Sequence, residues 1–177
     1  ERLDVNILGV CETRWTKNGD ITSENHRVIY AEGDKHQRGV ALILEKVRAR
    51  CVLGYWPISD RVLLVKLNGR PFNMSIIVVY APTSYSTEED IDKFYDSLDT
   101  AKDQCKSQEI VIIMGDLNAK IGNEGGSSMV GKHGLGERNE RRERWFQWCT
   151  INNQVITNTW FEHHPKRLWT WRSTGGG

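Results

Sequence analysis

Three apolar segments of the sequence each end in a side chain that can take part in acid–base or metal chemistry. These side chains are Glu12 after ILGVC, Tyr80 at the end of IIVVY, and Asp116 with Asn118 after IVIIMG. A lone ionised carboxylate at the end of an apolar segment is costly to desolvate. Glu12 and Asp116 are therefore expected either to be paired with a neighbouring group or to be placed there for chemistry.

The ends of neighbouring parallel strands meet at one edge of a sheet, where α/β proteins usually carry their active sites. If the three segments are such strands, two carboxylates, an amide and a phenol come together. This oxygen-rich set suits a hard cation such as Mg²⁺ or Mn²⁺. A metal ion there would neutralise phosphate charge and help to activate water as a nucleophile.

Each of these residues also has a purely structural explanation. Glu12 can pair with Arg14, two positions further on. Asp116 can accept a hydrogen bond from Asn118 in an Asx turn, and Tyr80 can be a packing residue before a proline-containing turn. Spacing alone does not decide between the explanations for any one residue, but the recurrence at three strand ends favours a common site.

Apolar patterns predict the strands that would position these residues. In the first 80 residues the predicted strand segments are DVNILGV (4–10), HRVIYAEG (26–33), RGVALILEK (38–46), RVLLVKL (61–67) and FNMSIIVVY (72–80). The Asn68-Gly69 pair between the last two is a strong hairpin signal. Part of the sheet structure is therefore expected to be antiparallel.

Helical periodicity replaces the strand pattern after residue 85. Ser86 and Glu89 form a capping box, ahead of apolar residues at helical spacing. Those apolar residues are Ile91, Phe94, Tyr95 and Leu98. The following EIVIIM (109–114) predicts a short strand that is covered on both faces.

The last third of the chain predicts one more helix and two strands. Asn139 is the expected N-cap of the helix, which carries three apolar residues on one face. These residues are Trp145, Trp148 and Cys149, and the predicted strands are QVITNT (154–159) and LWTWRS (168–173). Together the elements predict an α/β or α+β class with mixed sheets covered by helices. The length of 177 residues fits a single domain over residues 1–177.

Charge and aromatic residues gather in the C-terminal part. The whole chain holds 24 Lys and Arg against 23 Asp and Glu, so its net charge implies no polyanionic partner. Residues 132–172, however, hold eight Lys and Arg against four Glu, and five of the seven tryptophans. Aromatic rings among cations can stack on nucleic-acid bases. The alternative is that most of these rings belong to the core, since Trp is usually well buried.

The four cysteines are far apart and form no CxxC pair, so neither a zinc site nor a disulfide scaffold is indicated. Reduced thiols fit an intracellular protein, nuclear or cytoplasmic. No apolar run is long enough to span a bilayer, and the chain does not open on a signal peptide.

Six motifs occur in the order and at about the spacing found in one known family. They are ILGVCETRW, RGVALIL, VVYAPT, IMGDLNAKIG, HGLGERNE and NTWFEHHPKRLWTW. The chain resembles, over essentially its whole length, the apurinic-like endonuclease domain of non-LTR retrotransposons. The resemblance is closest to RTE-type elements and to the related craniofacial development protein 2 family, within the exonuclease-endonuclease-phosphatase superfamily.

This resemblance implies a four-layered α/β sandwich of two packed mixed sheets flanked by helices. It also implies a Mg²⁺- or Mn²⁺-dependent phosphodiesterase cleft at one edge, with DNA as the partner. In that cleft Glu12 would hold the metal ion, Asp116 would orient and deprotonate water, Asn118 would donate a hydrogen bond to the scissile phosphate, and Tyr80 would contact that phosphate. The residues expected to contact DNA are Arg14, Asn139, Arg141, Arg142, Thr170 and Trp171.

The sequence departs from the family at both ends. The family's first strand carries an Asn, and its last segments carry an Asp and an Asp-His pair, and the sequence shows none of these. The chain is therefore expected to lack the first and last strands, to have impaired activity, and to self-associate through unpaired sheet edges.

Three functions remain open from the sequence. The first is a metal-dependent DNA endonuclease of retrotransposon origin, which nicks DNA by attack of an activated water. The second is a non-catalytic module retained by a host to bind nucleic acid or protein. The third, a phosphatase acting on small phosphoesters, is less favoured because the motifs resemble those of the retrotransposon enzymes.

Overall fold

The computed structural model describes residues 5–33, 37–122, 128–134 and 140–164. The chain divides into two compact units, residues 1–118 and residues 119–177, which are described separately. The prediction of a single domain over the whole chain stays a prediction.

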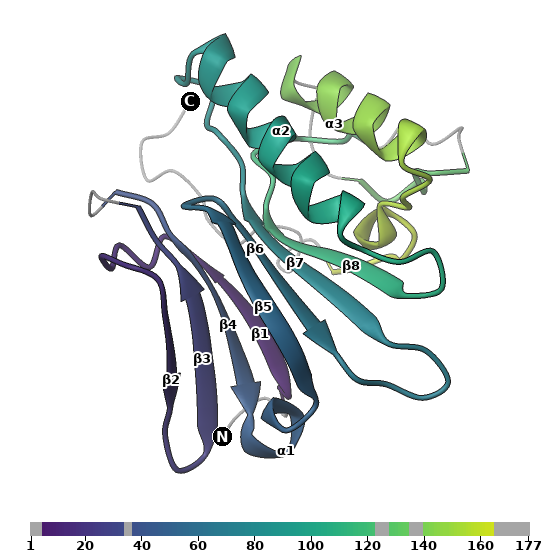
Figure 1. Ribbon diagram of the computed structural model, residues 1–177. Coiled ribbons are helices and arrows are strands. Elements are labelled where there is room, and N and C mark those ends of the chain that lie inside the picture. Colours follow the sequence, from purple (N-terminus) through teal and green to yellow (C-terminus); the bar gives the residue numbers. More distant parts are fainter. Residues whose placement is uncertain (1–4, 34–36, 123–127, 135–139, 165–177) are drawn as a thin grey trace. The chain divides into compact units, whose positions relative to one another are not determined.

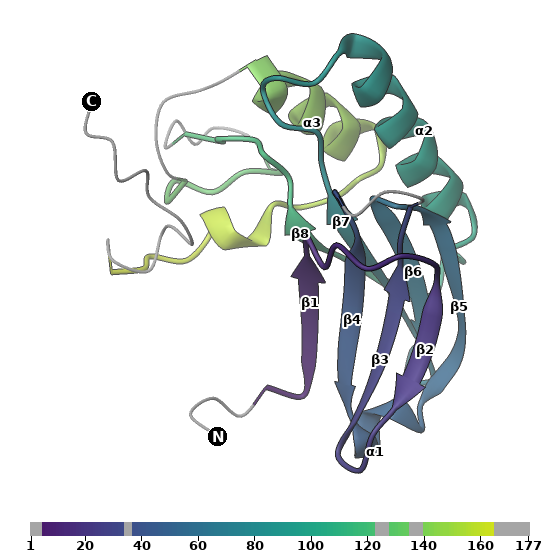
Figure 2. The same ribbon diagram turned by 90° about the vertical axis from the view of Figure 1, so that its left-hand side faces the viewer.

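The described part of the first unit contains two four-stranded sheets (Figures 1 and 2). The order in one sheet is β1-β4-β3-β2, and the order in the other is β5-β6-β7-β8. Their bounds are β1 Ile7–Cys11, β2 Gly19–Thr22, β3 His26–Ala31, β4 Val40–Glu45, β5 Val52–Ser59, β6 Val62–Leu67, β7 Met74–Tyr80 and β8 Ile110–Asp116. All neighbours pair antiparallel except β7 and β8, which are parallel.

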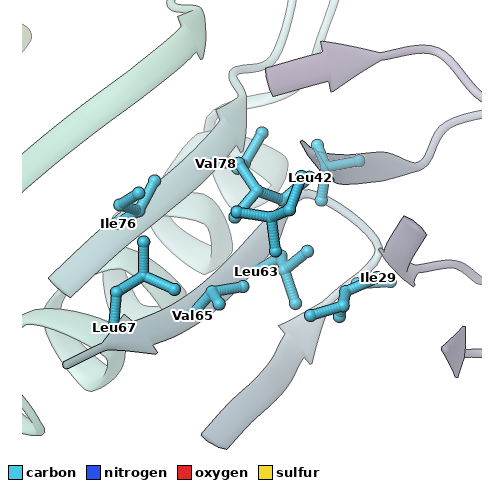
Figure 3. Close-up of a cluster of buried hydrophobic side chains, with 10 residues drawn as sticks. Ile29, Leu42, Leu63, Val65, Leu67, Ile76 and Val78 are labelled. Carbon is cyan, nitrogen blue, oxygen red and sulfur yellow. The ribbon is translucent and has the colours of Figure 1, made fainter. Parts of the chain in front are cut away.

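The core lies between the two sheets. Its side chains come from the inward faces of both sheets, and each of those labelled in Figure 3 is at most 2% exposed. They are Ile29 and Leu42 from the first sheet, with Leu63, Val65, Leu67, Ile76 and Val78 from the second. Each such side chain contributes about 1.5–3 kcal/mol to stability by its burial. The predicted α/β class with two packed sheets and accompanying helices is confirmed.

Helix α2 (Glu88–Asp103) covers the second sheet, where it contacts β5 and β6 (Figure 1). Its buried residues are Ile91, Phe94, Leu98 and Ala101, which agrees with the helical spacing of the sequence. The N-cap is Thr87, whose side chain accepts a hydrogen bond from the backbone N–H of Asp90. The prediction of Ser86 as the cap was therefore wrong by one residue. A one-turn helix, α1 (Lys46–Ala49), joins β4 to β5.

The strand β1 approaches the second sheet closely at β7 and β8. A Cβ atom on Gly9 would lie 2.9 Å from the sulfur of Met114 on β8, so a larger residue here would force the Met114 side chain to move. Two residues further on, the thiol of Cys11 donates a hydrogen bond to the carbonyl oxygen of Val79, at 3.3 Å. The end of β1 is thereby held against the ends of β7 and β8.

The structure corrects several predicted strands. Strands β2 and β5 were not predicted, because neither has a clear apolar pattern. Strand β8 is not covered on both faces, since Ile110 and Ile112 are 47% and 37% exposed. The physical reason is that β8 is an edge strand among the described residues, and α2 packs on β5 and β6 instead. The Asn68-Gly69 hairpin is confirmed between β6 and β7.

The described part of the second unit contains α3 (Glu140–Ile151) and a 3-10 turn, η1 (Thr157–Thr159). Trp145, Trp148 and Cys149 are buried on α3, as expected, and the two indole rings stack at 5.3 Å. The prediction of a strand over 154–159 was wrong: this segment forms one isolated bridge and then the turn. The predicted strand 168–173 and the predicted N-cap Asn139 lie outside the described residues.

Candidate active site

Two of the predicted site residues lie next to each other at the ends of parallel strands. Tyr80 ends β7 and Asp116 ends β8, and the two are register partners. The backbone N–H of Ala81 continues the pairing by donating to the carbonyl oxygen of Asp116, at 2.8 Å. The expectation that parallel strands bring their terminal polar groups together is confirmed for this pair.

Glu12 reaches the same place from the opposite sheet. It follows β1, and its Oε1 accepts a hydrogen bond from the hydroxyl of Tyr80 at 3.0 Å. The three strands were predicted to be neighbours in one sheet, and this was wrong for β1, which pairs with β4. The packing of the two sheets brings Glu12 to Tyr80 instead.

Both structural explanations considered for the carboxylates are also present. The other oxygen of Glu12 lies 3.1 Å from the guanidinium of Arg14, and Asp116 Oδ1 accepts from the backbone N–H of Asn118 at 2.9 Å. The side chains of Arg14 and Glu12 are 64% and 45% exposed. An exposed ion pair of this kind is worth only about 0–1 kcal/mol. It therefore gives a weak stability reason for the position of Glu12.

Asn118 joins the segments that follow β7 and β8. Its amide Nδ2 donates to the carbonyl oxygen of Ala81 at 2.8 Å. This bond holds the loop after Asp116 against the loop after Tyr80. One donor of the Asn118 side chain is therefore already used within the protein.

The backbone around the site adopts unusual conformations. Glu12, Arg14 and Asn118 have positive φ angles of 59°, 57° and 48°. For Glu12 and Arg14 this left-handed region costs of order 1–3 kcal/mol each, and such strain is concentrated at functional sites. Asparagine adopts the region more readily, so the cost at Asn118 is smaller. Gly115, with φ of 137°, precedes Asp116, and a Cβ there would collide with the carbonyl oxygen of Val79.

Burial and negative charge keep the groups around the carboxylates protonated. The pKa of Tyr80 is raised, first by burial and then by the hydrogen bond to Glu12, with Asp116 adding to the shift. The pKa of the Cys11 thiol is raised mainly by burial, and the charges of Asp116 and Glu12 act in the same direction. Tyr80 is therefore a neutral hydrogen-bond donor at physiological pH.

Arg61 is a site neighbour that the sequence reasoning missed. Its side chain is buried, with 8% exposure, and its NH1 donates to the carbonyl oxygen of Tyr80 at 2.9 Å. The guanidinium carbon lies 5.2 Å from the centre of the Tyr80 ring. Burial is the main cause that lowers the pKa of Arg61. The signal available in the sequence was an arginine placed directly before an apolar core strand.

The predicted DNA-contacting residues are divided between the two units, which are described separately. Arg14 is at the site, on the loop after β1. Arg141 and Arg142 belong to α3 in the second unit, where Arg142 is 8% exposed and lies 5.9 Å from the ring of Phe146. The other predicted contacts, Asn139, Thr170 and Trp171, lie outside the described residues.

The donor set fits a magnesium ion that keeps several non-protein ligands. Among the described residues, no three His, Cys, Asp or Glu side chains are grouped so that they alone could hold a metal ion. Mg²⁺ is commonly bound through one or two carboxylates, with water and substrate phosphates as the other ligands. Glu12, which accepts a hydrogen bond from Tyr80, and Asp116, the strand partner of Tyr80, are the two carboxylates that could serve in this way.

The fold and the site together define an α/β protein with a polar site at one end of two packed sheets. Comparison with models of known protein families finds no match. The chain is 37% identical over 177 residues to craniofacial development protein 2 of Bos taurus, and 35% identical over 177 residues to that of Tragulus javanicus. Both alignments cover 99% of this chain, which spans 30% and 31% of the length of these relatives.

The expected relation to craniofacial development protein 2 is thus confirmed, and the chain is a homologue of one segment of that protein. Comparison with solved structures finds the endonuclease domain of TRAS1, a telomere-specific non-LTR retrotransposon. It has a TM-score of 0.49 and 14% sequence identity, and the similarity covers 72% of this chain and 52% of that chain. No helix in the described ranges is long and apolar enough to cross a membrane.

Proposed function

We propose that this chain is the catalytic segment of a Mg²⁺- or Mn²⁺-dependent phosphodiesterase that nicks DNA. The observation that carries this proposal is that two acidic residues from opposite sheets, Glu12 and Asp116, both neighbour one tyrosine. Glu12 accepts the hydrogen bond of the Tyr80 hydroxyl, and Asp116 is the register partner of Tyr80. The resemblance of the surrounding motifs to those of retrotransposon endonucleases supports DNA as the substrate.

Each residue has a distinct part in the proposed reaction. Glu12 would hold the metal ion together with water and a substrate phosphate. The bound ion would supply neutralisation of the phosphate charge. Asp116 orients the attacking water and accepts its proton as the water oxygen bonds to phosphorus. The P–O bond to the neighbouring sugar then breaks, and the leaving sugar oxygen takes a proton from solvent to become the strand-end hydroxyl. Tyr80 orients Glu12 and contacts the phosphate, and Asn118 donates to the phosphate as negative charge develops.

Further parts of the proposal concern partners and location. Arg14, 64% exposed in its side chain, is a DNA contact next to the carboxylates. The four cysteines carry free thiols, which supports a reducing nuclear or cytoplasmic location.

The test is nicking of supercoiled plasmid in Mg²⁺ and in EDTA. Asp116→Asn keeps a side-chain oxygen that can accept from the Asn118 N–H but removes the charge and the base. We expect the nicking rate to fall about 10²- to 10⁴-fold in this variant. Asp96→Asn makes the same change on the exposed face of α2 and is expected to leave the rate unchanged.

Nicking that persists in EDTA or in Asp116→Asn would overturn the proposal. Folded protein that binds plasmid but never nicks it would instead favour the non-catalytic binding module.

A further inference from the structure

An exposed tryptophan stands on the loop that carries Glu12. Trp15 lies three residues beyond Glu12, and 45% of its surface is exposed. Tryptophan is usually well buried, so a half-exposed indole beside a candidate active site needs an explanation. Figure 2 shows the loop from β1 to β2 passing over the end of the first sheet at which β1 finishes.

The Trp15 ring packs against the ring of Tyr30. It meets the ring of Tyr30 edge-on, with 4.9 Å between centroids and an interplanar angle of 82°. Tyr30 in turn lies over Gly19, its register partner on β2, where any Cβ would collide with the tyrosine ring. The absence of a side chain at Gly19 thus leaves space for the Tyr30 ring, and the Tyr30 ring contacts Trp15.

The loop itself is tied to the first sheet at both ends. The backbone N–H of Arg14 donates to the carbonyl oxygen of Arg38 at 2.9 Å. At the other end the backbone N–H of Glu32 donates to Asn18 Oδ1, also at 2.9 Å. The hydroxyl of Thr13 donates to the carboxylate of Glu32. Trp15 is therefore presented on an anchored loop, which lowers the entropy cost of binding through it.

The charge next to the indole suits a nucleic acid. Arg14 and Lys17, on either side of Trp15 in the loop, are exposed. An exposed aromatic ring between cations is the combination that tracks a phosphate backbone and stacks on bases. Trp56 offers a contrast, because its ring already has the ammonium of Lys66 over it at 5.9 Å.

We propose that Trp15 stacks on an unpaired base of the bound DNA, so that the site prefers unpaired or distorted DNA over a regular duplex. In a regular duplex each base is already stacked on its neighbours and its face is not available. A mismatched or single-stranded base exposes its face at little cost. This inference rests on the proposed action on DNA and specifies the substrate class of that site.

The test measures binding in EDTA, without catalysis, to two DNA probes. One is a short duplex with a central run of mismatches, and the other is the same duplex fully paired. Trp15→Leu keeps an apolar contact with Tyr30 but has no ring, and we expect it to bind the mismatched probe about 5- to 150-fold more weakly. Trp15→Phe keeps a ring and is expected to retain most of the affinity, while the DNA-induced quenching of tryptophan emission decreases.

Trp56→Leu is the matched control and is expected to bind both probes like the wild type. The inference is overturned if Trp15→Leu binds the mismatched probe as tightly as the wild type, or if the wild type binds neither probe. Wild-type protein that does not nick plasmid, but whose preference for the mismatched probe is lost in Trp15→Leu, would overturn the proposed catalysis and leave the stacking role supported. If the wild type nicks plasmid in Mg²⁺ but Trp15→Leu binds the mismatched probe as tightly as the wild type, the stacking role is overturned and the proposed catalysis remains supported.

Discussion

At the scale of single residues, Tyr80 connects the two halves of the candidate site. Its hydroxyl bonds to Glu12, its strand partner is Asp116, and its carbonyl oxygen accepts from Arg61. Its raised pKa means that the phenol stays protonated and can donate throughout the physiological pH range. The site therefore depends on one neutral donor that holds a carboxylate in place.

Tyr80→Phe removes this donor while keeping the ring that packs beside Arg61. Hydrogen bonds to charged groups are worth about 1.5–3 kcal/mol, so we expect the nicking rate to fall about 10- to 100-fold. The melting temperature should change little. Tyr85→Phe, at a residue that is 97% exposed, is the control and should match the wild type in both measurements. An unchanged nicking rate in Tyr80→Phe would show that the Tyr80 hydroxyl has no part in the reaction.

At the scale of elements, one buried ion pair joins four segments far from the candidate site. Lys66 on β6 lies 3.1 Å from Glu109, which directly precedes β8, and the side chains are 12% and 5% exposed. Ser75 on β7 donates to Glu109 at 2.7 Å, and Lys66 also donates to the carbonyl oxygen of Gln104 after α2. The backbone N–H of Lys106 also donates a hydrogen bond to the Glu109 carboxylate, at 3.0 Å.

This network makes stability depend on pH. Burial acts to raise the pKa of Glu109, but the hydrogen bonds from Ser75, Lys106 and Lys66 outweigh it, so the pKa is lowered. A lowered pKa means that the folded state binds the proton less readily than the unfolded chain. The stabilisation is therefore complete above the ordinary glutamate pKa, about 4.3, and is lost as the pH falls through the folded-state value.

Glu109→Gln is expected to lower the free energy of unfolding at neutral pH by about 3–5 kcal/mol, since Lys66 is left as a buried charge without its counter-charge. The variant should also lose less stability than the wild type as the pH falls below the glutamate pKa, because residue 109 no longer takes up a proton. Urea unfolding from neutral to acid pH measures both effects. Glu89→Gln removes an exposed partner of Lys93 and should cost under about 1 kcal/mol. Equal effects of the two variants would contradict this account.

At the scale of the whole molecule, two sheet edges are unguarded within the described part of the chain. There β1 pairs only with β4, and β8 only with β7. Leu8 on β1 and Ile110 on β8 are 48% and 47% exposed. The opposite edges are less open to pairing with another chain. Strand β5 contains Pro57 and register shifts, and β2 carries the charged residue Asp20, which is paired with Arg27. The predicted self-association through sheet edges is therefore proposed for β1 and β8.

Sedimentation velocity over a range of concentrations tests this proposal. We expect the 177-residue chain to form larger species as its concentration rises. Leu8→Lys places a charge on the β1 edge and should shift the population toward the monomer, as lysine does on natural edge strands. Val47→Lys, at an equally exposed residue of α1, should not. A wild-type chain that stays monomeric at every concentration would rule out the edge contact.

The parts of this protein that the sequence predicted depend on local patterns. Strands β3, β4, β6, β7 and β8 have dense apolar runs, and α2 has a clear helical period, so each was found from its own residues. Strands β2 and β5 were missed because their faces are mixed and only pairing with β3 and β6 makes them strands. The cap at Thr87 was placed one residue early because adjacent Ser and Thr residues can both cap a helix.

The candidate site was also predicted from local patterns only in part. Sequence by itself determined that Glu12, Tyr80, Asp116 and Asn118 stand at strand ends, because each directly follows or ends an apolar run. Only the tertiary structure decided that Glu12 comes from the opposite sheet and that Arg61 packs beside Tyr80. It also decided that β8 is an edge strand within the described residues. The reason is physical: strand order and sheet packing depend on contacts between residues far apart in the chain, which no local pattern records.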